Sequence, residues 1–318
     1  MRAAVVTDFA EPPSCQEFPD PEAREEHEAV VDVVAAALSP RVRSQAAGSH
    51  YTSTDQLPLV PGIDGVGRTA DGRLRYFVLP DTSLGSLAER TVIDLRRSIE
   101  LPPGVDAVSL AAAMNPAMSS WVALRRRIEL RAGQRVMVLG ATGNAGRLAV
   151  QIARHVGASY VVAVGRDRDR LADLAAHHAD ATVSLTGSAE GVAEQLAEAG
   201  RDVDVVLDYL WGQPTADALH AIVPARADDT QTLSWIQIGS AAGPQSPIPS
   251  AALRATRLQI LGSGQGSVST RDIVAELSAL ADHIHRGNLF IDARPVPLAD
   301  IESIWMTPMS GPRLVVTP

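Results

Sequence analysis

The central part of the chain alternates between short apolar runs and longer segments with helical spacing. Residues 136–139 and 160–164 are apolar runs. Between them, Leu148, Ile152 and Val156 recur at the interval that places side chains on one face of a helix. The pattern therefore predicts a strand, a helix and a second strand, which together form a βαβ unit.

The same alternation continues after this unit. Apolar strands separated by helices favour a parallel sheet that is covered on both faces. We therefore predict an α/β fold with a doubly wound parallel sheet. The further strands are expected at 181–185, 203–207, 233–238 and 258–261, and the further helices at 189–199 and 214–222.

The first hundred residues have a different pattern, in which short β-type runs are separated by turn formers. Asp71-Gly72 is a hairpin turn signal between runs at 66–69 and 74–79. Residues 38–68 form a long segment that is rich in turn formers, and such loops often line a site. This part is expected to be β-rich, with further strands at 3–6, 29–37 and 86–94.

Helical spacing begins near Asp106, and Pro116 is expected to mark a break or a first helical position. The last fifty residues mix both kinds of element. We expect helices at 270–285 and 298–305 and strands near 289–296 and at 313–317.

The turn after the first strand of the βαβ unit carries the candidate chemistry. Glycines stand at 140, 143 and 146, which gives a variant of G-x-G-x-x-G with Ala141 in the first position. Glycine at 143 would let the backbone approach a pyrophosphate, and glycine at 146 would let the helix pack on the strand. The N–H groups that open the helix would face the phosphates. The predicted cofactor-binding residues here are Ala141, Thr142, Gly143, Asn144, Ala145 and Gly146.

The end of the second strand indicates which dinucleotide is bound. NAD sites usually have an acidic residue there, whereas NADP sites have arginine. The chain has Gly165 and Arg166, with Arg170 one turn later, and these three are predicted to bind NADPH. Two alternatives stay open: the arginines alternate with aspartates on a solvated helix start, or Asp167 binds the ribose of NADH.

Composition excludes several classes of protein. Of the 318 residues, 46% are hydrophobic and 20% are charged, which is typical of a folded globule. The 28 basic residues, all arginine, against 37 acidic residues give a net charge of −9, so nucleic acid is not an expected partner. A single cysteine, Cys15, excludes an intrachain disulfide and a Cys-rich zinc site. No run of about 18 apolar residues and no signal peptide is apparent, so we expect a cytoplasmic protein with no membrane partner.

The ordered set of motifs resembles the zinc-independent quinone oxidoreductase branch of the medium-chain dehydrogenase/reductase superfamily. The resemblance spans nearly the whole chain. The segments that carry it are LPLVPGIDGVGR (57–68), LPPGVDAVSLAAAM (101–114), GATGNAGRLAVQIARHVGA (140–158), VDVVLDYLWG (203–212), IQIGSAAG (236–243) and the ending PLADIESIW with GPRLVV.

The resemblance implies a domain organisation and an assembly. A GroES-like catalytic domain would be made from residues 1–115 and 265–318, with a Rossmann nucleotide-binding domain at 116–264 inserted between them and the active site in the cleft. Members of this family pair through the edge of the Rossmann sheet, so we expect a homodimer with residues 258–264 at its edge.

The chain departs from the zinc-binding members of the superfamily. Leu38-Ser39-Pro40 stands where their first ligand falls, and Gly62-Ile63-Asp64 replaces their Gly-His-Glu triplet. No metal is therefore expected. Without a Lewis acid, hydride transfer from NADPH to a quinone or an α,β-unsaturated carbonyl is the reaction that fits, because the substrate itself delocalises the charge.

Two residues are predicted to act in catalysis. Tyr51 lies in a loop that resembles the family's tyrosine-bearing loop, and its phenol would donate a hydrogen bond to a developing enolate; the alternatives are an aromatic wall or a surface loop residue. Asn115 lies where the resemblance implies contacts to the nicotinamide carboxamide; the alternative is a helix cap before Pro116. Backbone that lines the nicotinamide is expected just after strand ends, at Gly239, Ser240 and Gly262.

Two other functions remain open. One is a reductase or dehydrogenase of another small carbonyl compound. The other is an NADPH-binding sensor or interaction protein with little catalysis, since the predicted pocket has no obligatory acid, base or metal.

Overall fold

The computed structural model describes residues 1–49, 53–309 and 311–318. The chain divides into two compact units. The first unit consists of Met1–Asn115 and Val274–Pro318, and the second consists of Pro116–Ile273. Each unit has its own sheet and its own hydrophobic core.

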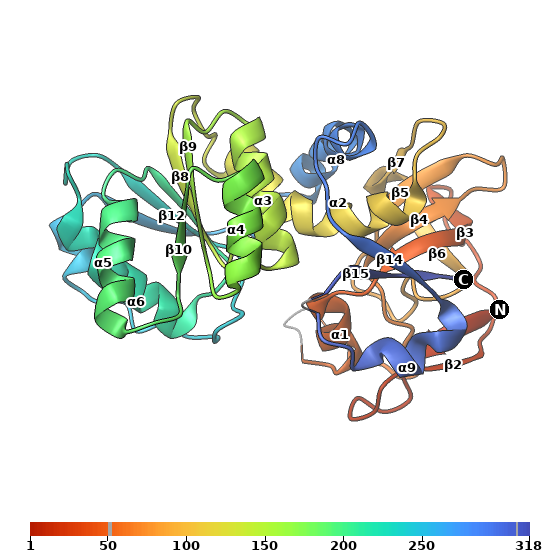
Figure 1. The fold of residues 1–318 in the computed structure, drawn as a ribbon. Coiled ribbons are helices and arrows are strands. Elements are labelled where there is room, and N and C mark those ends of the chain that lie inside the picture. Colours follow the sequence, from red (N-terminus) through yellow and green to blue (C-terminus); the bar gives the residue numbers. More distant parts are fainter. Residues whose placement is uncertain (50–52, 310) are drawn as a thin grey trace. The chain divides into compact units, whose positions relative to one another are not determined.

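The second unit contains a six-stranded parallel sheet with the order β10-β9-β8-β11-β12-β13. Figure 1 shows α3 and α4 on one face of this sheet and α5 and α6 on the other. The predicted α/β class and doubly wound sheet are therefore confirmed. The strands are β8 (Arg135–Leu139), β9 (Tyr160–Gly165), β10 (Ala181–Ser184), β11 (Val205–Asp208), β12 (Leu233–Gln237) and β13 (Leu258–Gly262).

The strand order reverses between β8 and β11. The chain runs outward from β8 to β10 in one direction, and β11 then pairs with the other side of β8, with Asp208 opposite Leu139. In open α/β sheets, ligands bind outside the carboxyl ends of the strands at this reversal. The glycine turn follows β8 and therefore lies at that point.

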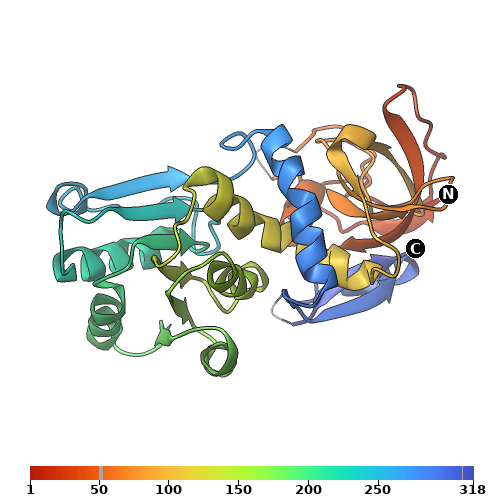
Figure 2. The same cartoon turned by 90° about the horizontal axis from the view of Figure 1, so that it is seen from above.

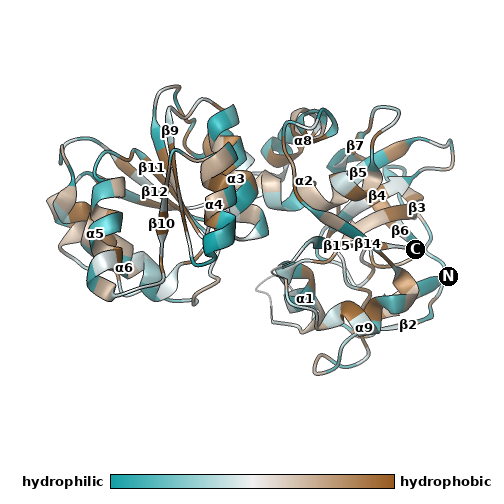
Figure 3. Cartoon of the chain, viewed as in Figure 1, coloured by the Kyte–Doolittle hydropathy of each residue, from teal (hydrophilic) through white to brown (hydrophobic). Residues whose placement is uncertain are grey.

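The helices of the second unit bury the apolar faces that the sequence pattern predicts. Met137, Val206 and Trp235 are fully buried between the helices and the sheet. In Figure 3 the central strands are coloured as hydrophobic, while α4 carries a hydrophilic outer surface. The helices are α3 (Asn144–His155), α4 (Arg168–His177), α5 (Ala189–Gly200), α6 (Gly212–Ile222), the 3-10 turn η3 (Val223–Ala225) and α7 (Ala252–Ala255).

The first unit is β-rich and is built from both ends of the chain. Its larger sheet has the order β14-β15-β3-β4-β5-β7, with β6 also paired to β3, and β1 and β2 form a separate pair. Figure 2 shows the blue C-terminal segment in the same unit as the red and orange N-terminal strands. The strands are β1 (Arg2–Val5), β2 (Ser14–Glu17), β3 (Glu28–Ala37), β4 (Asp64–Arg68), β5 (Leu74–Val78), β6 (Arg90–Asp94), β7 (Ser98–Glu100), β14 (Ala293–Pro297) and β15 (Arg313–Thr317).

Short helices complete the first unit: α1 (Pro40–Ala46), η1 (Leu95–Arg97), η4 (Leu298–Asp300) and α9 (Ile301–Trp305). α1 lies in the segment that was expected to be a long loop, so that prediction is wrong here. The Ser39 hydroxyl accepts a hydrogen bond from the Val42 N–H, and Pro40 occupies the first helical position. These are the usual signals of a helix start.

The predicted break at Pro116 is also wrong. A single helix, α2 (Ala107–Val122), contains Pro116 and continues into a π-helical turn, η2 (Ala123–Arg127). An interior proline costs about 3 kcal/mol in helix propensity. Burial of the apolar side chains around Pro116, including Met114, Ala117 and Trp121, offsets that cost.

One helical stretch in the described part of the chain, residues 107–127, is long and apolar enough to cross a membrane. Of its most apolar window, 67% is buried inside the structure, as in the core helix of a globular protein. The last long helix, α8 (Thr270–His285), has the bounds that the sequence predicted.

Candidate functional site

The glycine turn is anchored to the neighbouring strand. The N–H groups of Gly140 and Ala141 both donate to the carbonyl oxygen of Val164, each at 2.9 Å, and the Gly143 N–H donates to the Gly140 carbonyl at 3.1 Å. Gly140 has a φ of +87°, a conformation that glycine adopts without strain. The chain thus leaves β8 through a tight turn and begins α3 at Asn144.

Gly143 and Gly146 are glycines for different reasons. A Cβ atom at Gly146 would lie 2.1 Å from the Gly140 carbonyl oxygen, so the packing of α3 on the turn excludes any side chain there. A Cβ at Gly143 would meet only that oxygen, at 3.5 Å, and the φ of Gly143 is −79°. Neither packing nor backbone conformation among the described residues requires glycine at 143, and the exposed position leaves room for a ligand to approach the backbone.

The start of α3 suits an anion. No side chain of the described residues caps the helix at Gly143. The first N–H groups of a helix have no intrahelical acceptor, and the helix dipole favours negative charge at this end. The predicted residues Thr142, Asn144 and Ala145 are partly exposed here, whereas Ala141 is buried against the sheet. This arrangement fits the pyrophosphate of a dinucleotide.

The arginines after β9 differ in what they contact. Arg166 is exposed, and it makes no hydrogen bond or ion pair with any residue that the structure describes. Arg168 donates to the Thr186 hydroxyl at 3.2 Å. Arg170 is held in place, because its Nη1 donates to the Thr142 carbonyl at 2.7 Å and its Nε lies 3.4 Å from Asp167 Oδ2.

Asp167 caps α4 by accepting a hydrogen bond from the Arg170 N–H at 3.1 Å. The alternative that these arginines alternate with aspartates at a solvated helix start is thus correct in part, because α4 begins at Arg168. Gly165 ends β9, and an added Cβ there would lie 2.5 Å from Thr142 Cγ2. Of the two predicted arginines, Arg166 is therefore the one that is exposed and has no partner among the described residues.

The carboxyl end of β11 is organised by Asp208. This carboxylate is fully buried and accepts four hydrogen bonds, from the N–H groups of Leu210 and Trp211, the Thr215 hydroxyl and the Trp235 indole. The bonds hold the segment after β11 in a conformation where Trp211 has a φ of +54°. Asp208 is thus a structural residue of the strand end.

Tyr209, which follows Asp208 at the reversal of strand order, was not among the predicted residues. Its phenol oxygen lies 2.8 Å from Ser119 Oγ, and Ser119 donates to the Pro116 carbonyl at 2.7 Å. Burial raises the pKa of Tyr209 to about 12, and the hydrogen bond with Ser119 opposes part of that rise. The sequence signal that could have identified Tyr209 is a polar aromatic residue just after a predicted strand. The structure places that strand end at the reversal of strand order.

The other predicted backbone positions lie at neighbouring strand ends. Gly239 follows β12, and its N–H donates to the Asp208 carbonyl at 3.1 Å. Ser240 is exposed, and its carbonyl accepts from the Gly243 N–H. Gly262 is the last residue of β13, and its carbonyl accepts from Arg127 Nε at 2.9 Å. The Gly262 carbonyl is thus already paired with a side chain of the second unit.

Of the two predicted catalytic residues, the structure describes Asn115, which ends the first segment of the first unit. Asn115 is partly buried in the interior of α2, so its alternative as a helix cap before Pro116 is wrong. Tyr51 lies outside the described residues. The prediction for each as a catalytic residue stays a prediction.

The positions that replace zinc ligands have other partners. Ser39 is buried and caps α1. Asp64 is buried and accepts a hydrogen bond from the Tyr76 phenol at 2.8 Å. Burial raises the pKa of Asp64 to about 6, although the Tyr76 hydrogen bond and the charge of Arg313 oppose the rise. Among the described residues, no group of three or more His, Cys, Asp or Glu side chains is arranged to hold a metal ion.

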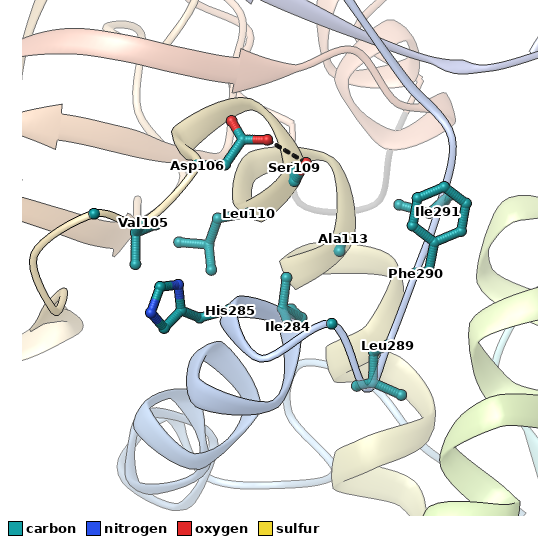
Figure 4. A pocket seen from close by; sticks show the side chains of 12 residues that line it. Val105, Asp106, Ser109, Leu110, Ala113, Ile284, His285, Leu289, Phe290 and Ile291 are labelled. Carbon is teal, nitrogen blue, oxygen red and sulfur yellow. Dashed lines mark hydrogen bonds between the residues drawn. The ribbon is translucent and has the colours of Figure 1, made fainter.

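The first unit also contains a pocket of about 270 Å³ between the start of α2 and the end of α8. Figure 4 shows Leu110, Ala113 and Ile284 on its apolar floor, and Asp106 hydrogen-bonded to Ser109 at one side. Phe290 is 62% exposed at the pocket. None of the predicted site residues that the structure describes lines this pocket.

Comparison with known proteins relates the whole chain to oxidoreductases. No family model matches the chain. A probable NADPH-dependent quinone reductase of Emericella nidulans, tdiC, is 30% identical over an alignment 359 positions long, which covers 100% of both chains. An NADPH-dependent alkenal/one oxidoreductase of Arabidopsis thaliana is 28% identical over 209 residues, covering 60% of this chain and 51% of that protein.

A solved structure shows the same likeness in three dimensions. The quinone oxidoreductase of Thermus thermophilus, solved also in complex with NADPH, matches with a TM-score of 0.83 and 26% identity. The match covers 100% of both chains. Both units are thus found together in one solved enzyme.

Proposed function

Because the chain belongs to the quinone oxidoreductase branch of the medium-chain dehydrogenase/reductase superfamily, we propose that it is an enzyme that uses NADPH to reduce quinones or α,β-unsaturated carbonyl compounds. The observation that carries the proposal is the end-to-end match to a probable NADPH-dependent quinone reductase. The match to an alkenal/one oxidoreductase supports enones as a second substrate class.

The second unit has the groups that would hold the cofactor. The uncapped start of α3 and the open space at Gly143 suit the pyrophosphate, and the exposed Arg166 suits a 2′-phosphate. Bound NADPH would supply the hydride, and the protein would contribute binding, orientation and exclusion of water. Asp167 is already the cap of α4, which favours NADPH over NADH.

We also propose that the reaction needs no zinc. The support is the chemistry of the side chains at the positions where zinc-binding members have ligands. Ser39 offers a hydroxyl that already accepts a backbone hydrogen bond, and Asp64 is bonded to Tyr76. Zinc in proteins is bound by thiolate, imidazole and carboxylate groups, and catalytic sites use three of them.

We further propose that the protein forms a homodimer through the outer edge of β13, which is the last strand of its sheet in the described part of the chain. Its apolar side chains Leu258, Ile260 and Leu261 are only half-buried, and Gly262 is exposed. A strand at the edge of a sheet presents unpaired backbone groups that readily pair with another chain. In a dimer with two-fold symmetry, the β13 edges of the two copies would lie together, and each would offer hydrogen-bond partners to the unpaired backbone groups of the other.

The experiment is a cofactor-oxidation assay with a panel of acceptors. Loss of NADPH is followed by absorbance with 1,4-quinones, 2-alkenals and saturated aldehydes as controls, on protein whose metal content is measured in parallel. Turnover with quinones or alkenals and less than stoichiometric zinc are expected. Tight NADPH binding without turnover on any acceptor would instead support a sensor, and stoichiometric zinc required for activity would contradict the metal-free reaction.

A further inference from the structure

Tyr209 occupies the centre of the carboxyl edge of the second unit's sheet. An added Cβ at Gly140, which follows β8, would lie 3.2 Å from Tyr209 Cβ. An added Cβ at Gly239, which follows β12, would lie 2.8 Å from the Tyr209 carbonyl oxygen. The strand ends on both sides of Tyr209 are thus glycines that approach it closely, and the point is the reversal of strand order where ligands of such sheets bind.

The proton positions in the Tyr209–Ser119 pair follow from simple counting. Each hydroxyl has one proton and can accept hydrogen bonds through its lone pairs. The Pro116 carbonyl oxygen can only accept, so the Ser119 proton points to it at 2.7 Å. The 2.8 Å contact between the two hydroxyls must then use the proton of Tyr209. Both protons are committed. Ser120, whose hydroxyl donates to the Ala117 carbonyl at 3.3 Å, also hydrogen-bonds with the phenol, and the capacity that remains on the pair is in acceptor lone pairs.

A ligand group that meets this pair must therefore be a donor. A quinone or enone oxygen is only an acceptor, and it would bind only if Tyr209 gave up its bond to Ser119. The carboxamide of the nicotinamide ring, in contrast, carries an NH2 group with two N–H donors. Tyr209 and Ser119 are both partly exposed residues, although the phenol is buried enough for its pKa to rise, so a ligand at the strand ends would meet this pair at the margin of the buried region.

We propose that the Tyr209 phenol oxygen, fixed by Ser119, accepts a hydrogen bond from the nicotinamide carboxamide and so selects cofactors with this amide. The inference rests on the proposed function, because it takes NADPH as the ligand. Tyr209 is then a cofactor-binding residue, and Ser119 is a positioning residue that holds the phenol. Loss of the Tyr209 hydroxyl should affect the nicotinamide half of the cofactor and leave the adenosine half unaffected.

The test measures binding rather than turnover. Dissociation constants are determined by calorimetry for NADP⁺, for its 3-acetylpyridine analogue, in which a methyl group replaces the amide NH2, and for adenosine 2′,5′-bisphosphate. A net hydrogen bond contributes about 1 kcal/mol, so wild type should bind NADP⁺ roughly five times more tightly than the analogue. Tyr209→Phe should bind the two equally.

Two controls make the result specific. Adenosine 2′,5′-bisphosphate should bind wild type and Tyr209→Phe equally, which shows that the variant is folded at the site. Tyr160→Phe changes a tyrosine at the amino end of β9, where Arg135 lies over its ring at 4.0 Å, and should retain the preference for NADP⁺.

Each contrary outcome overturns a distinct statement. If wild type shows no preference for NADP⁺ over the analogue, or if Tyr209→Phe keeps the preference, the inference is wrong while the proposed function stands. If wild type binds neither dinucleotide, the proposed function fails and the inference fails with it.

Discussion

The guanidinium of Arg170 donates a hydrogen bond to the carbonyl oxygen of Thr142 at 2.7 Å. This contact joins the first turn of α4 to the turn that precedes α3, and a second contact with Asp167 fixes the same side chain. Arg170 therefore holds the glycine turn, whereas the exposed Arg166 has no hydrogen bond or ion pair with the residues that the structure describes. The two arginines should consequently have different effects on cofactor binding.

Arg170→Met should weaken NADPH and NADH binding by a similar factor, about 3- to 10-fold, because it removes a hydrogen bond to the turn that both cofactors would use.

Arg166→Ala should weaken NADPH binding by about 10-fold or more and leave NADH binding unchanged, because only NADPH carries the 2′-phosphate. Fluorescence titrations with both cofactors measure the four constants.

Arg168→Ala is the matched control for these variants, because Arg168 is exposed and its side chain bonds only to Thr186 among the hydrogen bonds described above. It should change neither affinity by more than about 2-fold. A selective loss of NADPH binding in Arg170→Met would show that Arg170 itself reads the 2′-phosphate.

The two glycines of the turn should separate folding from binding. Gly146→Ala places a Cβ 2.1 Å from a backbone oxygen, so we expect a loss of stability of about 1–3 kcal/mol. Gly143→Ala meets no clash and should change stability by less than about 0.5 kcal/mol. It should nevertheless weaken NADPH binding by about 10-fold or more, because its methyl group takes the space left for the phosphates.

Urea denaturation and cofactor titration of the same two variants provide the comparison. A stable Gly143→Ala protein with unchanged NADPH affinity would contradict the assignment of this turn as the pyrophosphate site.

Stability near pH 5 should depend on Asp64. Its pKa is raised from 3.8 to about 6 in the folded protein, so the folded state holds this proton more tightly than the unfolded state does. Protonated Asp64 therefore contributes to the free energy of unfolding. This contribution is fully present below about pH 4 and is lost as the pH rises from about 4 to about 6. The shift corresponds to a change on the order of 3 kcal/mol.

Asp64→Asn removes this titration while keeping an acceptor for the Tyr76 hydroxyl. The difference in unfolding free energy between Asp64→Asn and wild type, measured with urea at pH 4.5 and pH 7, should grow in favour of the variant at the higher pH. The difference cancels the contributions of the other carboxylates, so a constant value across this range would refute the prediction.

The edge of β13 should control assembly. Leu261→Lys puts a charge on the half-buried edge, and in a two-fold dimer the same charge from the partner copy would lie across the interface. We expect the dimer dissociation constant to rise by at least about 10-fold. Light scattering coupled to size-exclusion chromatography over a range of concentrations measures it.

Met306→Lys is the control for this experiment, because Met306 is 79% exposed and belongs to the first unit, whereas β13 belongs to the second. It should leave the oligomeric state unchanged. A Leu261→Lys protein that stays dimeric at the concentrations where wild type does would place the interface elsewhere.

Much of the fold is determined by patterns that act over a few residues. The alternation of apolar runs and helical segments predicted the order of elements around β8, α3 and β9, and helix α8 was predicted with its observed bounds. A local signal of the same kind stands at Ser39-Pro40, where a capping serine and a first-position proline start α1. At Pro116 the local rule failed, because burial of the surrounding helix outweighed the intrinsic cost of proline.

The site divides in the same way. The sequence by itself determined the glycine turn and the arginines after β9, because a turn conformation and a strand end are written in neighbouring residues. Only the tertiary structure decided that Arg170 is bound to Thr142 while Arg166 has no partner in the described part of the chain, and that Tyr209 meets Ser119 from 90 residues away. Such contacts depend on how strands and helices distant in sequence are packed side by side, and no local pattern records that packing.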